Sequence, residues 1–333
     1  MKRWPATTAT GVVALLASSA CSGNHQSTLD PAGPGSTVAA TSWWILFGVA
    51  AGVCVLVIGA AVLAVVVRRR ARRVNNSTGH RLVLVLGLIL PALVFAGTFA
   101  LSVVGIARTS APAGQPAATV EVIGHTWWWE VRYLGADGAV TAVTANEIHV
   151  PVGAPVRVRL RTADVIHSFW VPELMPKTDL LPDRVNDTWL QADRAGTYRG
   201  QCAEYCGLQH AHMAFQVVAE PDADFRRWLT GQEQDAATPA TAQERRGMEV
   251  FTSGSCATCH TIRGTSADGH VGPDLTHLGS RQWIAAGAVP NDVGHVSGWV
   301  ANSQSVKPGN LMPPQHLSPA DLHAVVAYLE GLR

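Results

Sequence analysis

Five side chains that bind soft metals lie within sixteen residues of this chain. The stretch GQCAEYCGLQHAHMAF, residues 200–215, contains Cys202, Cys206, His210, His212 and Met213, whereas only four cysteines lie elsewhere. Thiolate, imidazole and thioether ligands together are preferred by copper in electron transfer, and zinc has little use for a thioether. The stretch therefore predicts a copper site. A Cys2His2 zinc site and a Cys202–Cys206 disulfide are the alternatives.

The two cysteines favour two coppers over one. A blue-copper centre needs one cysteine, so a pair separated by one short loop indicates two metals bridged by both sulfurs. Each copper then needs its own imidazole. His210 supplies one, and the other is either His212 or the distant His167 in DVIHSFWVP. In an extended chain His212 would point away from His210, which favours His167 and leaves His212 open.

A second motif, Cys256-x-x-Cys259-His260, lies near the C-terminal end. In this pattern both thiols form thioethers to haem, and the adjacent histidine becomes the proximal ligand of the iron. A zinc half-site would need further ligands at matching spacing, and a redox dithiol does not need the histidine. The motif predicts one covalent haem c held by Cys256 and Cys259, with His260 on the iron.

The expected sixth ligand of this iron is Met312 in PGNLMPP. It is the only methionine after the motif, and the flanking prolines keep it out of a helix. An axial methionine raises the potential of a haem into the range of an electron carrier. The competing ligands are the histidines that follow the motif: His270, His277, His295, His316 and His323.

Two apolar runs, residues 43–67 and 82–107, predict a membrane hairpin. Each exceeds the roughly 20 residues needed to cross a bilayer. The short loop between them, RRRARRVNNSTGHR, is rich in arginine and is expected in the cytoplasm, which places everything from Arg108 onward outside. Residues 1–21 are typical of an export signal. LLASSAC resembles a lipoprotein processing site, with ordinary cleavage as the alternative to a lipid on Cys21.

The segments beyond the hairpin divide into β and helical parts. Period-two alternation at Val156–Arg161 and further short β-like runs between residues 119 and 219 predict an antiparallel sandwich or barrel. Near the end, Ser318 and Pro319 begin a predicted helix. The expected parts are a signal segment 1–21, a linker 22–40, the hairpin 41–107, a copper domain 108–229, a linker 230–241 and a haem domain 242–333.

Several stretches resemble known families. CATCH, VGPDLTHLGSR, KPGNLMP and the closing helix resemble a class I cytochrome c domain. DVIHSFWVPEL, KTDLLPDRVN and GQCAEYCGLQHAHM resemble the copper-binding half of subunit II of haem–copper cytochrome c oxidases, and GHTWWWEVRY and LDPAGP fit the same family. The resemblance implies a multidomain protein with a two-helix transmembrane hairpin, an all-β cupredoxin-like sandwich and an all-α cytochrome c domain.

The resemblance also implies a ligand set and leaves His212 out of it. Glu204 would contribute its backbone carbonyl to the copper centre, and its side chain would reach a magnesium ion shared with subunit I. Trp127 would mark the place where electrons enter, with an interfacial or core aromatic as the alternative. The implied ligands of the binuclear copper centre are His167, Cys202, Glu204, Cys206, His210 and Met213.

The function implied by the resemblance is electron input to an oxidase. Electrons from a cytochrome c donor would pass through haem c and the binuclear copper to haem in subunit I, which reduces dioxygen and pumps protons. The expected partners are subunits I and III, cytochrome c or a cytochrome bc complex, and membrane lipid, in a bacterial cell membrane crossed twice. The net charge of +1 and the lack of a basic patch exclude nucleic acid.

Two points limit this interpretation. Family members often carry a glutamate near the start of the second span, at the mouth of a proton path, and residues 80–84 here contain no carboxylate. Proton entry is therefore expected to use another group or another subunit. The alternative function is a membrane-tethered extracytoplasmic copper and haem redox protein outside an oxidase complex. A protein that only handles copper or senses redox state would have no need of a haem module, so the haem motif argues against that version.

Overall fold

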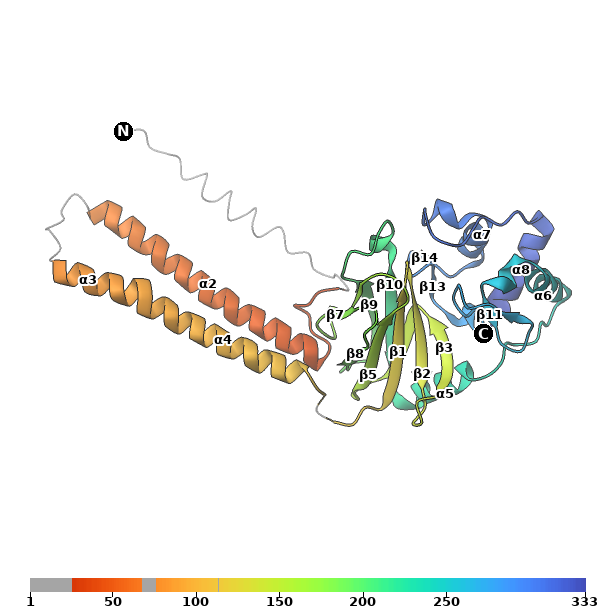
Figure 1. Cartoon of the computed structure of the whole chain (residues 1–333), viewed down its shortest axis with the longest axis horizontal. Coiled ribbons are helices and arrows are strands. Elements are labelled where there is room, and N and C mark those ends of the chain that lie inside the picture. The colour runs from red at the N-terminus through yellow and green to blue at the C-terminus, as the bar shows by residue number, and fades with distance from the viewer. Residues whose placement is uncertain (1–25, 68–75, 113) are drawn as a thin grey trace, which may run out of the picture.

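The computed structural model describes residues 26–67, 76–112 and 114–333 of the chain (Figure 1). The export-signal segment with Cys21, and five arginines of the short loop, lie outside the described residues. Those arginines are Arg68, Arg69, Arg70, Arg72 and Arg73.

Two long apolar helical segments form a hairpin that projects from the rest of the molecule (Figure 1). Helix α2 is Pro34–Val67, and the returning segment consists of α3 (Asn76–Leu84), a π-helical turn (Val85–Ile89) and α4 (Leu90–Thr109). Both segments are long and apolar enough to span a membrane. The π turn immediately precedes Pro91, whose missing N–H and ring clash with the preceding turn disturb regular α-helical bonding.

The predicted linker 22–40 is wrong for its second half. Helix α2 already begins at Pro34, a favoured first helical residue. Ala32 and Ser36 are buried, and their amides donate to the carbonyls of Glu173 and Leu174 in the β domain. The Trp189 indole likewise donates to the carbonyl of Thr109 at 2.9 Å. Both ends of the hairpin are therefore attached to the sandwich.

The middle of the chain folds into two five-stranded sheets. Their spatial orders are β3-β2-β1-β5-β8 and β4-β10-β9-β6-β7. The strands are β1 (Ala118–His125), β2 (Trp128–Leu134), β3 (Val140–Ala145), β4 (Glu147–Pro151), β5 (Val156–Thr162), β6 (His167–Trp170), β7 (Thr178–Leu180), β8 (Asn186–Leu190), β9 (Gly196–Cys202) and β10 (Ala214–Glu220).

The sandwich confirms the period-two prediction and corrects the expected topology. On β5, Val156, Val158 and Leu160 are buried between the sheets, as alternation requires. However, β1 pairs with β5 and β4 pairs with β10 in parallel, so the sandwich is mixed and not purely antiparallel. An aromatic cluster of Trp129, Phe169 and Phe215 fills the core near the end of β9.

The C-terminal segment is built around helices on the side of the sandwich away from the hairpin (Figure 1). They are α6 (Ala242–Ser253), α7 (Val293–Asn302) and α8 (Pro319–Gly331), with two minimal hairpins, β11 (Thr261–Ile262) with β12 (Ala267–Asp268), and β13 (Trp283–Ile284) with β14 (Val289–Pro290). As predicted, Ser318 caps α8 by accepting from the Asp321 amide. The start of α6 at Thr241 has a reciprocal capping box with Glu244.

The predicted linker 230–241 is not a loose tether. Its first residues end helix α5 (Asp222–Gln232), which the sequence interpretation missed. The Arg263 guanidinium donates to the carbonyls of Gln232 and Gln234, and His277 contacts the latter carbonyl as well. These hydrogen bonds therefore hold the start of the linker against the helical segment.

The crossing of α6 and α8 depends on Gly247. A Cβ at this position would lie 2.0 Å from the carbonyl oxygen of Ala324, so only glycine allows the two backbones to approach this closely. We predict that Gly247→Val forces the helices apart and destabilises the segment by about 1–3 kcal/mol, because overpacking shifts the backbone. Urea unfolding followed by circular dichroism measures this.

Gly231→Ala in α5 is the matched control, since a Cβ there meets no described atom of another segment within 4 Å. Its stability is expected within about 1 kcal/mol of the parent chain. Equal stabilities of the two variants would contradict the assigned role of Gly247.

Candidate metal centres

The loop between β9 and β10 carries most of the first site. Cys202 is the last residue of β9, and Met213 directly precedes β10. The Cys202 amide donates to the Met213 carbonyl at 2.9 Å, which closes the base of the loop. A single 3-10 turn, His210–His212, then directs His210 inward. Strand pairing thus brings both ends of the loop together.

The side chains of this loop converge on the two sulfurs. The Sγ atoms of Cys202 and Cys206 are 3.8 Å apart. Cys206 Sγ lies 3.6 Å from His210 Nδ1 and 3.7 Å from Met213 Sδ. Cys202 Sγ lies 3.2 Å from the carbonyl oxygen of Glu204. A disulfide needs about 2.05 Å between sulfurs, and both cysteines are free.

His167 completes the cluster from another strand. Strand β6 pairs with β9 so that Phe169 faces Cys202, and this register brings His167 Nδ1 to 3.9 Å from Cys202 Sγ. His167 is fully buried. Gly124 on β1 leaves the space, because a Cβ there would lie 2.8 Å from the imidazole ring.

His212 is directed elsewhere. It is exposed, and its Nδ1 contacts the Gln209 side-chain oxygen at 2.8 Å. Of the two histidines that the sequence left open, the structure brings His167 to the sulfurs. This agrees with the ligand set implied by the family resemblance.

Asp164 orients His167 and was missed by the sequence interpretation. His167 Nε2 donates to Asp164 Oδ1 at 2.8 Å, which leaves Nδ1 free toward the sulfurs. The Thr126 amide and hydroxyl donate to the other carboxylate oxygen. Burial alone would raise the pKa of Asp164, but these hydrogen bonds outweigh it and lower the pKa. The signal was a carboxylate three residues before a ligand candidate.

The two thiols share one proton readily. The Cys206 thiol stabilises the Cys202 thiolate by a hydrogen bond and lowers the pKa of Cys202. The same hydrogen bond, which Cys206 donates to Cys202, raises the pKa of Cys206, and burial and the charge of the Cys202 thiolate raise it further. Cations between the sulfurs would remove this repulsion. The donor set and the spacing therefore fit a soft binuclear metal centre.

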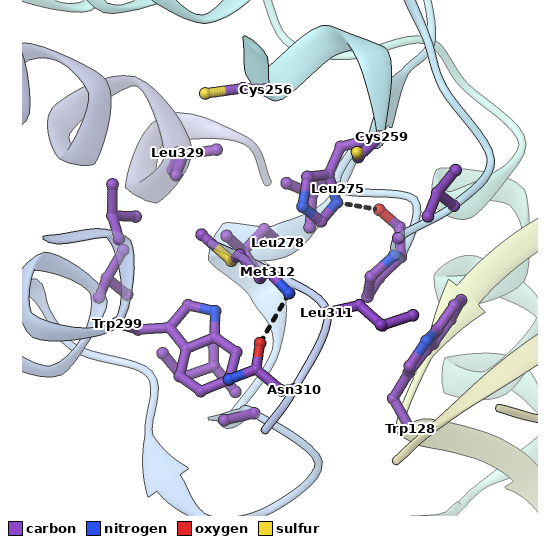
Figure 2. Close-up of a pocket in the computed structure, with 18 of the residues that line it drawn as sticks. Trp128, Cys256, Cys259, Leu275, Leu278, Trp299, Asn310, Leu311, Met312 and Leu329 are labelled. Carbon is purple, nitrogen blue, oxygen red and sulfur yellow. Dashed lines mark hydrogen bonds between the residues drawn. The ribbon is translucent and has the colours of Figure 1, made fainter. Parts of the chain in front are cut away.

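The second site is a cavity in the C-terminal segment (Figure 2). Cys256, Cys259, His260 and Met312 all line it, together with apolar side chains such as Leu278 and Trp299. His260 Nδ1 donates to the Pro273 carbonyl at 2.8 Å, which leaves Nε2 available to a metal. Burial lowers the pKa of His260, so the imidazole is neutral, the form that binds iron.

The loop that carries Met312 is fixed through its backbone. The Met312 amide donates to Asn310 Oδ1 at 2.8 Å, and its carbonyl accepts from Ser303 and Gln304. Figure 2 shows Met312 directed into the cavity that the two cysteines also line. None of the five competing histidines lines this cavity, and two of them have other contacts: His277 contacts the Gln234 carbonyl, and His295 pairs with Asp292.

The cavity fits a haem in two further respects. Arg281 is buried in its wall, and its Nε has no hydrogen-bond partner among the described residues, so it can donate to a carboxylate of the group. A Cβ on Gly272 would lie 2.6 Å from His260 Cε1, so glycine at this position leaves room for the imidazole ring of His260.

Trp127 lies between the two sites. Its indole Nε1 donates to the Cys206 carbonyl at 2.9 Å. Thr126, Trp127, Trp128 and Asn146 of the sandwich also line the cavity of the C-terminal segment. The β sandwich therefore forms one wall of this cavity, an arrangement that the sequence pattern did not predict.

Known families match both halves of this arrangement. The family model described as "Cytochrome C oxidase subunit II, periplasmic domain" matches residues 136–220, and that of "Cytochrome c" matches residues 244–333. The chain therefore carries a domain of the cytochrome c oxidase subunit II family, followed by a cytochrome c domain. The first match includes the whole sulfur cluster, and the second includes the cavity residues from Cys256 to Met312.

Individual relatives agree with the family. "Cytochrome c oxidase subunit 2" of Alkalihalophilus pseudofirmus is 35% identical over 66% of this chain, and the protein of the same description from Bacillus subtilis is 30% identical over 66%. The chain covers 63% of the length of each. The crystal structure of the periplasmic domain of subunit II from Bradyrhizobium japonicum is 30% identical, with a TM-score of 0.34 over 37% of this chain and 97% of that chain.

We predict that Asp164→Asn weakens copper binding about 10- to 100-fold, the usual effect of losing the partner of a ligating histidine. The amide cannot match the charge that holds the His167 tautomer. Competition with a copper chelator measures the affinity. Asp187→Asn, which removes an exposed pair with Arg157 on β8, is the control and is expected to change nothing. Equal affinities of both variants would refute the orienting role.

Proposed function

We propose that this chain is the subunit through which electrons enter a cytochrome c oxidase. When bound, covalent haem c would accept an electron from a cytochrome c donor, and a binuclear copper centre would pass it to haem in subunit I for reduction of dioxygen with proton pumping. Family membership supports this role. The apolar runs 43–67 and 82–107 contain no histidine that could hold haem or copper inside the membrane, so dioxygen chemistry is assigned to the partner subunit.

The observation that carries the proposal is the convergence of four further ligand atoms on the two free sulfurs of Cys202 and Cys206. His167, Cys202, Glu204 through its carbonyl, Cys206, His210 and Met213 would together hold the centre. The ligands come from β6 and from one loop between paired strands, so they are held in place before metal arrives. A rigid site favours electron transfer because little needs to rearrange.

In the C-terminal domain, Cys256 and Cys259 would attach the haem, and His260 and Met312 would bind its iron. The hydrogen bond from His260 to the Pro273 carbonyl orients the proximal imidazole. Trp127 is proposed as the group through which electrons reach the copper centre. Its bond to the Cys206 carbonyl and its position in the haem cavity wall support this.

The remaining parts of the proposal rest on the family. The exposed Glu204 carboxylate is proposed to bind a magnesium ion shared with subunit I. Subunits I and III, a cytochrome c or cytochrome bc donor and membrane lipid are the proposed partners. The proposed location is a bacterial cell membrane, with the sandwich and the haem domain on the extracytoplasmic side. A separate redox protein outside an oxidase remains the second candidate, but no contact in the structure favours it.

We predict that the soluble part of the chain, Arg108 to Arg333, binds two coppers and one covalent haem. Because both thiolates bridge the metals, one unpaired electron would be shared by two equivalent coppers and give a mixed-valence EPR spectrum. Metal analysis and EPR measure both results. An axial spectrum of a single copper in the parent chain would refute the binuclear assignment. The Cys206→Ser variant, which lacks one of the two thiolates, is expected to give such a spectrum.

We predict that Met312→Ala lowers the haem potential by on the order of 100 mV, within the range of about 0.8 V set by axial ligands. Loss of the thioether would also introduce high-spin character. Redox titration and the visible spectrum test this. Met248→Ala on α6, where the methionine packs against the helical core, is the matched control and should leave the spectrum unchanged. A normal spectrum for Met312→Ala would point to a histidine ligand.

A further inference from the structure

The helical segment is docked on the copper domain through backbone contacts next to both sites. The Ala214 amide, one residue after Met213, donates to the Ala286 carbonyl at 3.0 Å. The Gln209 side chain donates to the Pro308 carbonyl at 2.8 Å. The Gln282 amide contacts the Glu147 carboxylate at 3.4 Å. Each contact joins residues that lie more than sixty positions apart in the chain.

Lys307 lies at the centre of this interface. Only 3% of its surface is exposed. Its Nζ donates to three carbonyl oxygens, those of Trp127 at 2.7 Å, His212 at 2.9 Å and Ala285 at 3.1 Å. An ammonium group has three donors, so all of them are used. No carboxylate lies within ion-pair distance of Lys307 in the described part of the chain.

The three accepting carbonyls belong to segments that build the two sites. Trp127 bonds to the Cys206 carbonyl through its ring, and His212 directly precedes Met213. Ala285 and Ala286 both adopt left-handed backbone conformations, with φ of 55° and 58°. Such conformations are costly for alanine and are kept where the surroundings demand them. Here they direct one carbonyl to Lys307 and the next to Ala214.

Burial of this ammonium is expensive. It lowers the pKa of Lys307 to about 7. Removal of the lysine would leave three carbonyls at the interface without a donor. Interfaces between domains of one chain are ordinarily mobile unless large and apolar, so a buried polar bond of this kind decides how firmly the haem domain stays docked.

We propose that Lys307 is a positioning residue that locks the haem domain onto the copper domain and thereby fixes the separation across which electrons pass between the two centres. This inference rests on the proposed function for its electron-transfer consequence, whereas the docking itself does not. The loop that contains Lys307 continues to Met312. Lys307 itself bonds to the carbonyl of His212, which directly precedes Met213, and to that of Trp127, whose ring bonds to the Cys206 carbonyl. One side chain therefore holds the ligand-bearing segments of both sites in register.

The test is Lys307→Met in the full-length chain, purified in detergent and studied at pH 6, where the parent lysine is charged. Hydrogen–deuterium exchange at the Ala214 amide reports docking without depending on either metal. The variant is expected to exchange there about 30-fold faster, which equals about 2 kcal/mol at 1.4 kcal/mol per tenfold change. Lys177→Met, an exposed lysine on the copper domain, is the matched control and should exchange as the parent does.

A second measurement distinguishes the docking role of Lys307 from the assignment of the copper and haem ligands. Flash reduction of the haem in the same variant should give slower reduction of copper, while the haem potential and the copper EPR spectrum stay those of the parent. Parent-like exchange and parent-like copper reduction in Lys307→Met would overturn the proposal. Absence of the copper or haem spectra in the parent chain would instead refute the proposed function and leave the exchange result to decide on docking.

Gln209→Leu is a milder variant for the case in which Lys307→Met does not accumulate. It removes one neutral hydrogen bond across the same interface and is expected to raise exchange at Ala214 about fivefold. Protection equal to that of the parent in this variant would show that the contacts around Lys307 do not hold the domains together, and the proposal would fail.

Discussion

The 3.8 Å separation of the Cys202 and Cys206 sulfurs is the constraint on which the copper site depends. Two thiolates this close repel each other, so the arrangement is stable only with a shared proton or with cations between them. The fold holds the sulfurs there by closing the loop at its base and by packing it on an aromatic core. Strand pairing offsets the repulsion between the two sulfurs, and the same pairing makes the site rigid.

Rigidity extends from the copper site to the haem domain through a polar interface. Trp127 contributes to both sites at once, since its ring bonds to the copper loop and lines the haem cavity. Lys307 fastens the two backbones together around it. Because the haem domain and the copper domain belong to the same chain, electron transfer between them would need no diffusional encounter. The linker, bound along the helical segment by Arg263, adds to this restriction.

The sequence pattern predicted those elements whose periodicity is long or whose caps are strong. Alternation revealed β5, and Ser318 with Pro319 revealed the start of α8. The β-like runs predicted between residues 119 and 219 did not include β3 and β7, because these strands are short and partly polar. The parallel pairs were also missed, since strand order is a property of the assembled sheets. Residues 34–40 were misjudged because small residues resemble a linker until their burial against the Glu173 and Leu174 carbonyls is known.

By itself the sequence determined the chemistry: which ligand atoms are present, that a haem-attachment motif follows a copper-like cluster, and that two segments are apolar enough for a membrane. These depend on residue type and on short spacing, which are local properties. Only the tertiary structure decided that His167 and not His212 approaches the sulfurs, that Asp164 orients it, and that the haem cavity is closed by the copper domain. Those outcomes depend on strand register and domain docking, which join residues far apart in the chain and are set by packing.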